Sequence, residues 1–204
     1  QNSSDGFIEN VWLGRNDTNN QDEFTARAQI DWQITADFGL NTTVHFVDVD
    51  NGYDAFSLDR NRTTLSDQPG FDRQKSQALA MTADYQGMSW ANLQLQATAL
   101  DADLAYGYDE DWSYVGIAPD WEYSSTDEYY RTRKDKSIEA KLSSKSRVDN
   151  AWLVGFYYAD KDEDLERFYT YSDIFSSQVQ RQDSALFAHY KYVLSDTQWL
   201  TTSL

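Results

Sequence analysis

The chain has no cysteine, so it can hold neither a disulfide framework nor a thiolate metal site, and it has no thiol nucleophile. Histidine is almost as scarce, with only His45 and His189 in 204 residues. The Gly-x-Ser-x-Gly, P-loop and His-Glu-x-x-His motifs are also missing. We therefore expect a protein that is not an enzyme and that carries no metal and no cofactor.

Basic residues are few: 17 Lys and Arg stand against 34 Asp and Glu, which gives a net charge of −17. Such a charge repels a phosphate backbone, so we expect no nucleic-acid partner. Long apolar runs are absent and the mean hydropathy is −0.73, which excludes a transmembrane helix. Membrane-spanning strands are compatible with these values, because their residues face lipid and a polar interior in turn.

Proline occurs only twice, at Pro69 and Pro119, and both lie in loop-like stretches, so long segments are free to form strands. The clearest is residues 23–35, in which apolar and polar residues alternate. This segment is about twice as long as the usual strand of a soluble protein. Tilted by about 40°, its eleven alternating residues, 24–34, would rise roughly 28 Å, close to the thickness of a bilayer's apolar core. Its length favours a membrane barrel over a sandwich.

The alternation recurs and predicts nine strands, at residues 7–14, 23–35, 40–49, 76–86, 90–101, 131–143, 151–159, 183–194 and 199–204. Short links are expected at 36–39, 86–89, 146–150 and 195–198. Longer polar links alternate with them, at 16–22, 51–74, 102–129 and 161–182. Tight turns at one end and long loops at the other are typical of outer-membrane barrels. The sequence predicts an all-β chain, an antiparallel up-and-down transmembrane β-barrel segment spanning residues 1–204.

The alternation also predicts which side chains share a face. We expect Phe24, Ile30, Trp32, Leu93 and Leu95 to face lipid, and Arg27, Asp31, Gln94 and Gln96 to face a polar interior. Several apolar stripes end in aromatic residues that would form an interfacial girdle: Tyr85, Trp90, Trp152, Tyr190, Tyr192 and Trp199.

Three stretches of the chain carry a family resemblance: "DGFIENVWLGRNDTNNQDEFTARAQIDWQIT" (5–35), "NGYDAFSLDRNRTTLSDQPGFDRQ" (51–74) and "YGYDEDWSYVG" (106–116). The first resembles an early barrel segment of TonB-dependent outer-membrane receptors, and the other two resemble extracellular loops of that family. The resemblance implies a 22-stranded barrel in the outer membrane of a Gram-negative bacterium, in contact with outer-membrane lipid. It also implies energy-coupled uptake of a scarce nutrient, such as a metal chelate, a corrinoid or an oligosaccharide. These residues would form the middle of the barrel, and the plug domain that contacts the TonB complex would lie outside them.

Aromatic and acidic residues gather in two of the long links. Aromatic rings offer flat contact area to a small-molecule ligand, and carboxylates orient its polar groups. We therefore expect an extracellular ligand site formed by Tyr53, Asp54, Phe56, Tyr106, Tyr108, Asp109, Asp111, Trp112 and Tyr114.

Other interpretations of these residues remain open. The acidic loop could be a solvated bend, or it could bind calcium, as could residues 160–164, although neither has the spacing of an EF-hand. Asp109 and Asp111 could in principle hydrolyse glycosides, but acidic residues occur throughout this chain. The alternative for the whole chain is a soluble secreted β-sheet binding module, for example one that binds carbohydrate.

Overall fold

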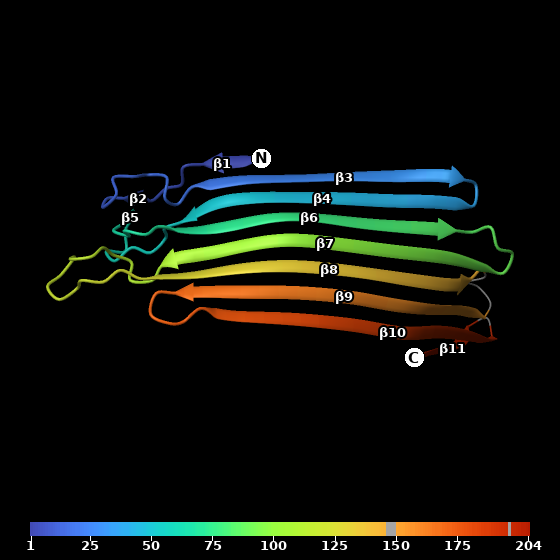
Figure 1. Ribbon diagram of the computed structural model, residues 1–204. Coiled ribbons are helices and arrows are strands. Elements are labelled where there is room, and N and C mark those ends of the chain that lie inside the picture. Colours follow the sequence, from blue (N-terminus) through green and yellow to red (C-terminus); the bar gives the residue numbers. More distant parts are fainter. Residues whose placement is uncertain (146–149, 196) are drawn as a thin grey trace.

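The computed structural model describes residues 1–145, 150–195 and 197–204. The described residues contain strands, turns and loops but no helix, and hence none able to cross a membrane. Nine strands form one antiparallel sheet in the order β1-β3-β4-β6-β7-β8-β9-β10-β11, and β2 and β5 pair separately as two parallel strands (Figure 1). The strands are β1 Asn2–Ser4, β2 Glu9–Asn10, β3 Gln21–Thr35, β4 Phe38–Tyr53, β5 Thr63–Thr64, β6 Gly70–Tyr85, β7 Ala91–Asp109, β8 Thr126–Ser144, β9 Ala151–Tyr169, β10 Phe175–Ser195 and β11 Gln198–Ser203.

The all-β, up-and-down antiparallel fold predicted from the alternation is confirmed. The sheet ends at β1 and β11, which lie at opposite edges, so the described residues form an open single layer and not a closed barrel (Figure 1). Few apolar side chains are buried: among the described residues the buried hydrophobic ones are Ile8, Ala91, Ala102 and Ala159. The sheet therefore has no hydrophobic core of its own.

Cross-strand register sorts the side chains onto two faces. One row of partners runs through Trp32, Leu40, Ala83, Leu95, Ala140, Phe156 and Leu186. The row beside it, on the opposite face, runs through Asp31, Asn41, Thr82, Gln96, Glu139, Tyr157 and Ala185. The predicted sharing of faces is thus confirmed, and the second face is polar in this row from β3 to β8 but carries Tyr157 and Ala185 on β9 and β10. We call the first face the banded face and the second the cavity face.

The apolar residues of the banded face form a band at the turn end of the sheet. Ile30, Trp32 and Leu186 are more than half exposed, at 63%, 60% and 79%. Toward the loop end, each strand changes from apolar to polar on this face. Counted from the turn end, the apolar band on β3, β4, β6, β7, β8, β9 and β10 ends at Phe24, Phe46, Leu79, Ala99, Ile138, Tyr158 and Leu186. The next residues on that face are Asp22, Asp48, Gln77, Asp101, Lys136, Asp160 and Ser184. Beyond this polar zone, β6, β8 and β9 carry a separate group of aromatic rings on this face near the loops, in which Tyr130 contacts Phe71 and Phe168.

This boundary crosses the sheet obliquely. The row of partners that starts at Phe24 on β3 continues through Asp48, Lys75, Asp103, Thr132 and Asp164 to Gln178 on β10. On the banded face of β10, however, the apolar band ends at Leu186, which lies eight residues nearer the turn end than Gln178. The limit of the apolar band therefore moves stepwise in one direction from β3 to β10, by two residues at four of the six strand-to-strand steps and by none at the other two.

Turns and loops lie at opposite ends of the sheet, as expected (Figure 1). The short links after β3 and β6 occupy residues 36–37 and 86–90. The predicted links at 146–150 and 195–198 include residues 146–149 and 196, which lie outside the described residues. Two of the long links are shorter than predicted, at 54–69 and 110–125, because β4, β6, β7 and β8 extend into them.

Three sequence predictions about the strands and the girdle are wrong. Residues 7–14 do not form a strand of the main sheet: only Glu9–Asn10 is extended, and a turn that includes Gly14 at φ 64° follows it. Residues 161–182 are not a long loop, because β9 and β10 stay paired from Lys191–Ala151 to Phe175–Arg167. Trp199 is not part of the predicted girdle, because it pairs with Val193 and so lies on the cavity face. There the Lys191 ammonium group lies 5.1 Å from the centre of its ring.

Candidate functional site

A cavity of about 790 Å³ lies on the cavity face at the loop end of the sheet. Its floor is formed by four strands, with Gln74 on β6, Leu104 on β7, Tyr129 and Arg131 on β8, and Leu165 on β9. The loops 54–69 and 110–125 supply Phe56 and Trp112 at its edge. The volume falls within the range of small-molecule binding sites, roughly 300–1,000 Å³.

Six aromatic rings form a continuous set of contacts beside this cavity. Phe56 and Trp112 stack at 4.8 Å with planes 4° apart, although they come from different loops. Tyr53 meets Tyr106 edge-on at 4.9 Å, and Tyr106 lies 5.8 Å from Tyr108 and 6.4 Å from Tyr129. The structure therefore brings together five of the residues expected in the ligand site: Tyr53, Phe56, Tyr106, Tyr108 and Trp112. Tyr106 and Tyr108 belong to β7, and not to a loop as predicted.

The hydroxyl groups of Tyr106 and Tyr108 remain hydrogen-bond donors at neutral pH. Burial is the main cause that raises the pKa of both phenols, and the nearby charge of Asp127 raises that of Tyr108 further. The charged residues of the lining are two positive and two negative: Arg73, Arg131, Asp72 and Glu110. The site combines apolar ring surface with few and nearly balanced charges.

The predicted acidic residues lie elsewhere, in the supports of the two loops. Asp54 is 4% exposed and accepts hydrogen bonds from Asn10 Nδ2 (2.8 Å) and Thr64 Oγ1 (2.7 Å). Asp109, also 4% exposed, accepts one from Ser66 Oγ (2.5 Å) and others from the amides of residues 111 and 112. Burial raises the pKa of Asp109 to about 6. Asp109 thus fastens one loop to the other, whereas Asp54 ties the loop 54–69 to β2 and to itself. Neither carboxylate is in the cavity lining.

Asp111 and Tyr114 also contact protein groups outside the lining. Asp111 accepts hydrogen bonds from the Ser113 hydroxyl (2.7 Å) and the Ser125 amide (2.7 Å). The ring of Tyr114 stacks on Trp12 at 3.8 Å, with the planes 2° apart. Among the described residues, no group of three or more acidic or histidine side chains is placed to hold one metal ion.

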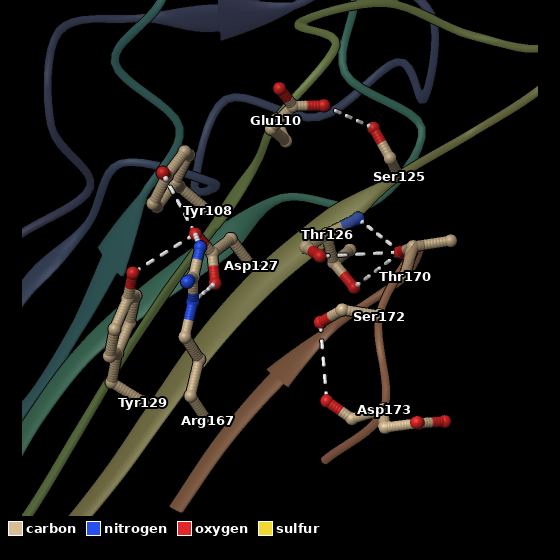
Figure 2. A network of polar contacts seen from close by, with 10 residues as sticks. All are labelled: Tyr108, Glu110, Ser125, Thr126, Asp127, Tyr129, Arg167, Thr170, Ser172 and Asp173. Atoms are coloured by element: carbon tan, nitrogen blue, oxygen red, sulfur yellow. Dashed lines mark hydrogen bonds and ion pairs between the residues drawn. The ribbon is translucent and has the colours of Figure 1, made fainter. Parts of the chain in front are cut away.

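A buried carboxylate on β8 holds two of the cavity tyrosines, and sequence reasoning missed it. Figure 2 shows Asp127 facing Arg167 of β9, whose Nε and Nη2 each donate a hydrogen bond at 2.7 Å. The hydroxyls of Tyr108 (3.3 Å) and Tyr129 (3.1 Å) also donate to Asp127 (Figure 2). The hydrogen bonds from Arg167 are the main cause that lowers the pKa of Asp127, so the carboxylate stays charged.

Signals for these missed residues existed in the sequence. Asp127, Tyr129 and Arg131 continue the alternation of residues 137–141 toward the N-terminus, and Arg167 continues that of 151–159. Asp127, Tyr129 and Arg167 fell in links that were expected to be loops, because charged residues there masked the period of two, whereas Arg131 lay at the start of a predicted strand.

Comparison of the chain with protein-family models and with curated proteins finds no match.

Proposed function

We propose that these residues form part of the wall and the extracellular end of an outer-membrane β-barrel receptor that captures a scarce nutrient for energy-coupled uptake. The receptor is of the TonB-dependent type in the outer membrane of a Gram-negative bacterium. The oblique edge of the apolar band is the observation that carries this proposal.

The slope of that edge agrees with the tilt of strands in a membrane barrel. From β3 to β10 the edge moves eight residues, or about 26 Å along the strands, over six inter-strand steps of about 4.8 Å. Its slope is then roughly 42° from the perpendicular to the strands. Strands of outer-membrane barrels tilt by about 35–45°, so a membrane surface should cross them at this slope.

The height of the band supports the same orientation. It spans 11 residues on β3, from Phe24 to Ile34, and 7 on β6, from Leu79 to Tyr85. With a tilt of roughly 42°, these lengths correspond to about 17–27 Å, compared with about 25 Å for the apolar belt of outer-membrane barrels. Beyond the band the strands continue toward the loops, which would place the loop end outside the membrane.

The cavity fits this orientation, because it lies on the opposite face at the loop end. In a barrel it would face the lumen near the extracellular mouth, where a nutrient enters. Its rings provide contact area, and we expect no covalent chemistry there. The plug domain and the TonB complex would act through residues outside this sequence.

A soluble secreted binding module has less support. In such a module each strand would be about five residues long, and the apolar face of the sheet would be buried against a second sheet. Here seven strands have 15 to 21 residues, and no second layer covers the band in the described part of the chain.

Spin labels on the banded face test the proposal. Single cysteines at positions 24 and 186 of the complete protein, labelled with nitroxides in lipid vesicles, should report the same shallow depth from oxygen and nickel-complex accessibility. A label at 178 shares the cross-strand row of Phe24 and serves as the matched control, since it should be in water. The proposed membrane surface would be refuted if the labels at 24 and 178 lay at equal depth, or if the labels at 24, 178 and 186 were all exposed to water.

A further inference from the structure

A second hollow lies on the banded face, where the apolar band meets the polar zone. It has a volume of about 430 Å³ and is separate from the aromatic cavity. Two neighbouring cross-strand rows line it. One row is Val44, Leu79, Ala99 and Lys136, and the other is Phe46, Gln77, Asp101 and Lys134. The hollow therefore has an apolar floor that ends at two lysines on the same strand, β8.

The two lysines are available to a partner outside the chain. Both are exposed, and among the described residues neither ammonium group lies within 4.0 Å of a carboxylate oxygen. Carboxylates are nevertheless near. Lys134 is opposite Asp101 and Asp162 in the register, and Lys136 is opposite Asp160. Positive and negative groups thus alternate across three strands at the edge of the band.

We propose that this hollow binds a phosphorylated glycolipid of the outer leaflet, of the lipid A type. An acyl chain lies along Val44, Leu79 and Ala99, and a phosphate binds between Lys134 and Lys136. The site rests on the proposed function, because the banded face must contact the bilayer.

The alternating charges favour a glycolipid with two phosphates over a lipid with one. Lysines alone would attract any anionic headgroup. The carboxylates beside them would repel a phosphate directly, but oxygen ligands from a carboxylate and a phosphate can share one divalent cation. A headgroup with a second phosphate can contact the lysines and, through such a cation, Asp101 or Asp160.

Native mass spectrometry of the complete protein in a neutral detergent tests the site, with diphosphoryl lipid A and Mg²⁺ as the probe. Lys134→Gln/Lys136→Gln should bind the probe roughly 20-fold more weakly, since each lysine near an anionic lipid contributes about a factor of five. The matched control is Lys141→Gln/Lys161→Gln. It removes the same charge from β8 and β9, but on the cavity face, opposite Gln94 and Asp135. The control should bind lipid A as the wild type does.

Unchanged binding by the Lys134/Lys136 variant would overturn the assignment, and so would an equal loss in the control. Phosphatidylglycerol that binds as tightly as lipid A would also overturn it, since the site would then recognise any anionic lipid. The spin labels separate this failure from that of the proposed function. If the spin labels at 24, 178 and 186 have the expected depths but the protein does not prefer lipid A over phosphatidylglycerol, the lipid site alone is rejected. If the labels at all three positions are in water, the membrane orientation is rejected.

Discussion

Asp109 illustrates how a single acidic residue of this chain acts on the loops. It is buried between the loops 54–69 and 110–125, where Ser66 and two backbone amides donate hydrogen bonds to it. Burial is the largest cause of the rise in its pKa to about 6, and the charges of Asp111 and Asp67 add to it. A carboxyl group whose pKa rises on folding favours the folded loop in its protonated form.

We therefore predict that the packing of these loops depends on pH. Their closure should be most stable below about pH 4 and should weaken as the pH rises through about 6. Amide hydrogen exchange at residues 110–113, corrected for intrinsic rates, should show protection falling over this interval. Asp109→Asn should remove the dependence, because its carbonyl can still accept from the amides and its NH₂ group can donate to Ser66. A variant that keeps the wild-type pH profile would contradict this account.

Sequence reasoning at the residue scale found the aromatic residues of the site better than the charged ones. Aromatic side chains of the two links converge because Phe56 and Trp112 gain contact area by stacking. The roles of Asp54 and Asp109 depend on partners 44 and 43 residues away, Asn10 and Ser66, which only the folded chain brings near. For the same reason the contact of Asp127 with Arg167, 40 residues apart, could not be predicted from composition or spacing.

At the scale of elements, the loops 54–69 and 110–125 form one unit at the mouth of the cavity. Asp67 Oδ1 accepts a hydrogen bond from the Ser124 hydroxyl at 2.7 Å, and the Asp67 amide donates to the Ser113 carbonyl at 2.9 Å. The stacked pair Phe56–Trp112 lies between the two loops at the cavity edge. Ligand capture should therefore depend on rings from both loops.

For the receptor proposed above, we predict that Phe56→Ala/Trp112→Ala in the complete protein lowers uptake of the cognate nutrient at least tenfold at limiting concentration. Each ring contributes about 1 kcal/mol beyond simple burial, so that the loss of two exceeds a factor of ten. Transport assays in cells, with surface expression measured in parallel, check the change. Trp12→Ala/Tyr114→Ala is the matched control, since it also removes a stacked pair of the loop end, one that lies outside the lining. Equal losses in both variants would mean that loop packing, and not ligand contact, controls uptake.

Strand positions were predicted better than strand lengths. Residues 23–35 were placed correctly within two residues of β3, because apolar and polar residues alternate there without interruption. On β9 the alternation continues past residue 159, but with charged residues on both faces from Asp160 to Asp164. The polarity of such a stretch predicts a loop, although its backbone is fully paired with β8 and β10.

At the scale of the whole molecule, the oblique band could not be seen in the sequence. The alternation fixes which residues share a face of one strand, but the slope of the band depends on how neighbouring strands align. That alignment is set by the exact lengths of the turns. The predicted bounds of the links at 36–39 and 86–89 leave the register of the neighbouring strands uncertain by several residues. Once the register is known, Phe24 and Leu186 mark the two ends of one oblique line across the sheet.

A lysine introduced at the same height along the strands should change the stability of the protein by different amounts on the two faces of the sheet. Leu95 lies in the middle of the band on β7, half exposed, between Ala83 and Ala140. Its neighbour Gln96 lies on the cavity face opposite Glu139. Leu95→Lys should destabilise the complete protein by about 2–4 kcal/mol, the cost of a lysine facing the bilayer midplane, whereas Gln96→Lys should change its stability by less than about 1 kcal/mol.

Equilibrium unfolding in phospholipid vesicles measures both changes, and the pair controls for strand, depth and added charge. The expected difference depends on the face alone, because the two positions are adjacent on one strand. In lipid, a lysine at position 95 has no polar partner and must distort the bilayer to reach water. A lysine at position 96 can approach Glu139 in a polar interior instead. A larger cost for Gln96→Lys than for Leu95→Lys would reverse the assignment, placing the cavity face against the membrane and the apolar band inside.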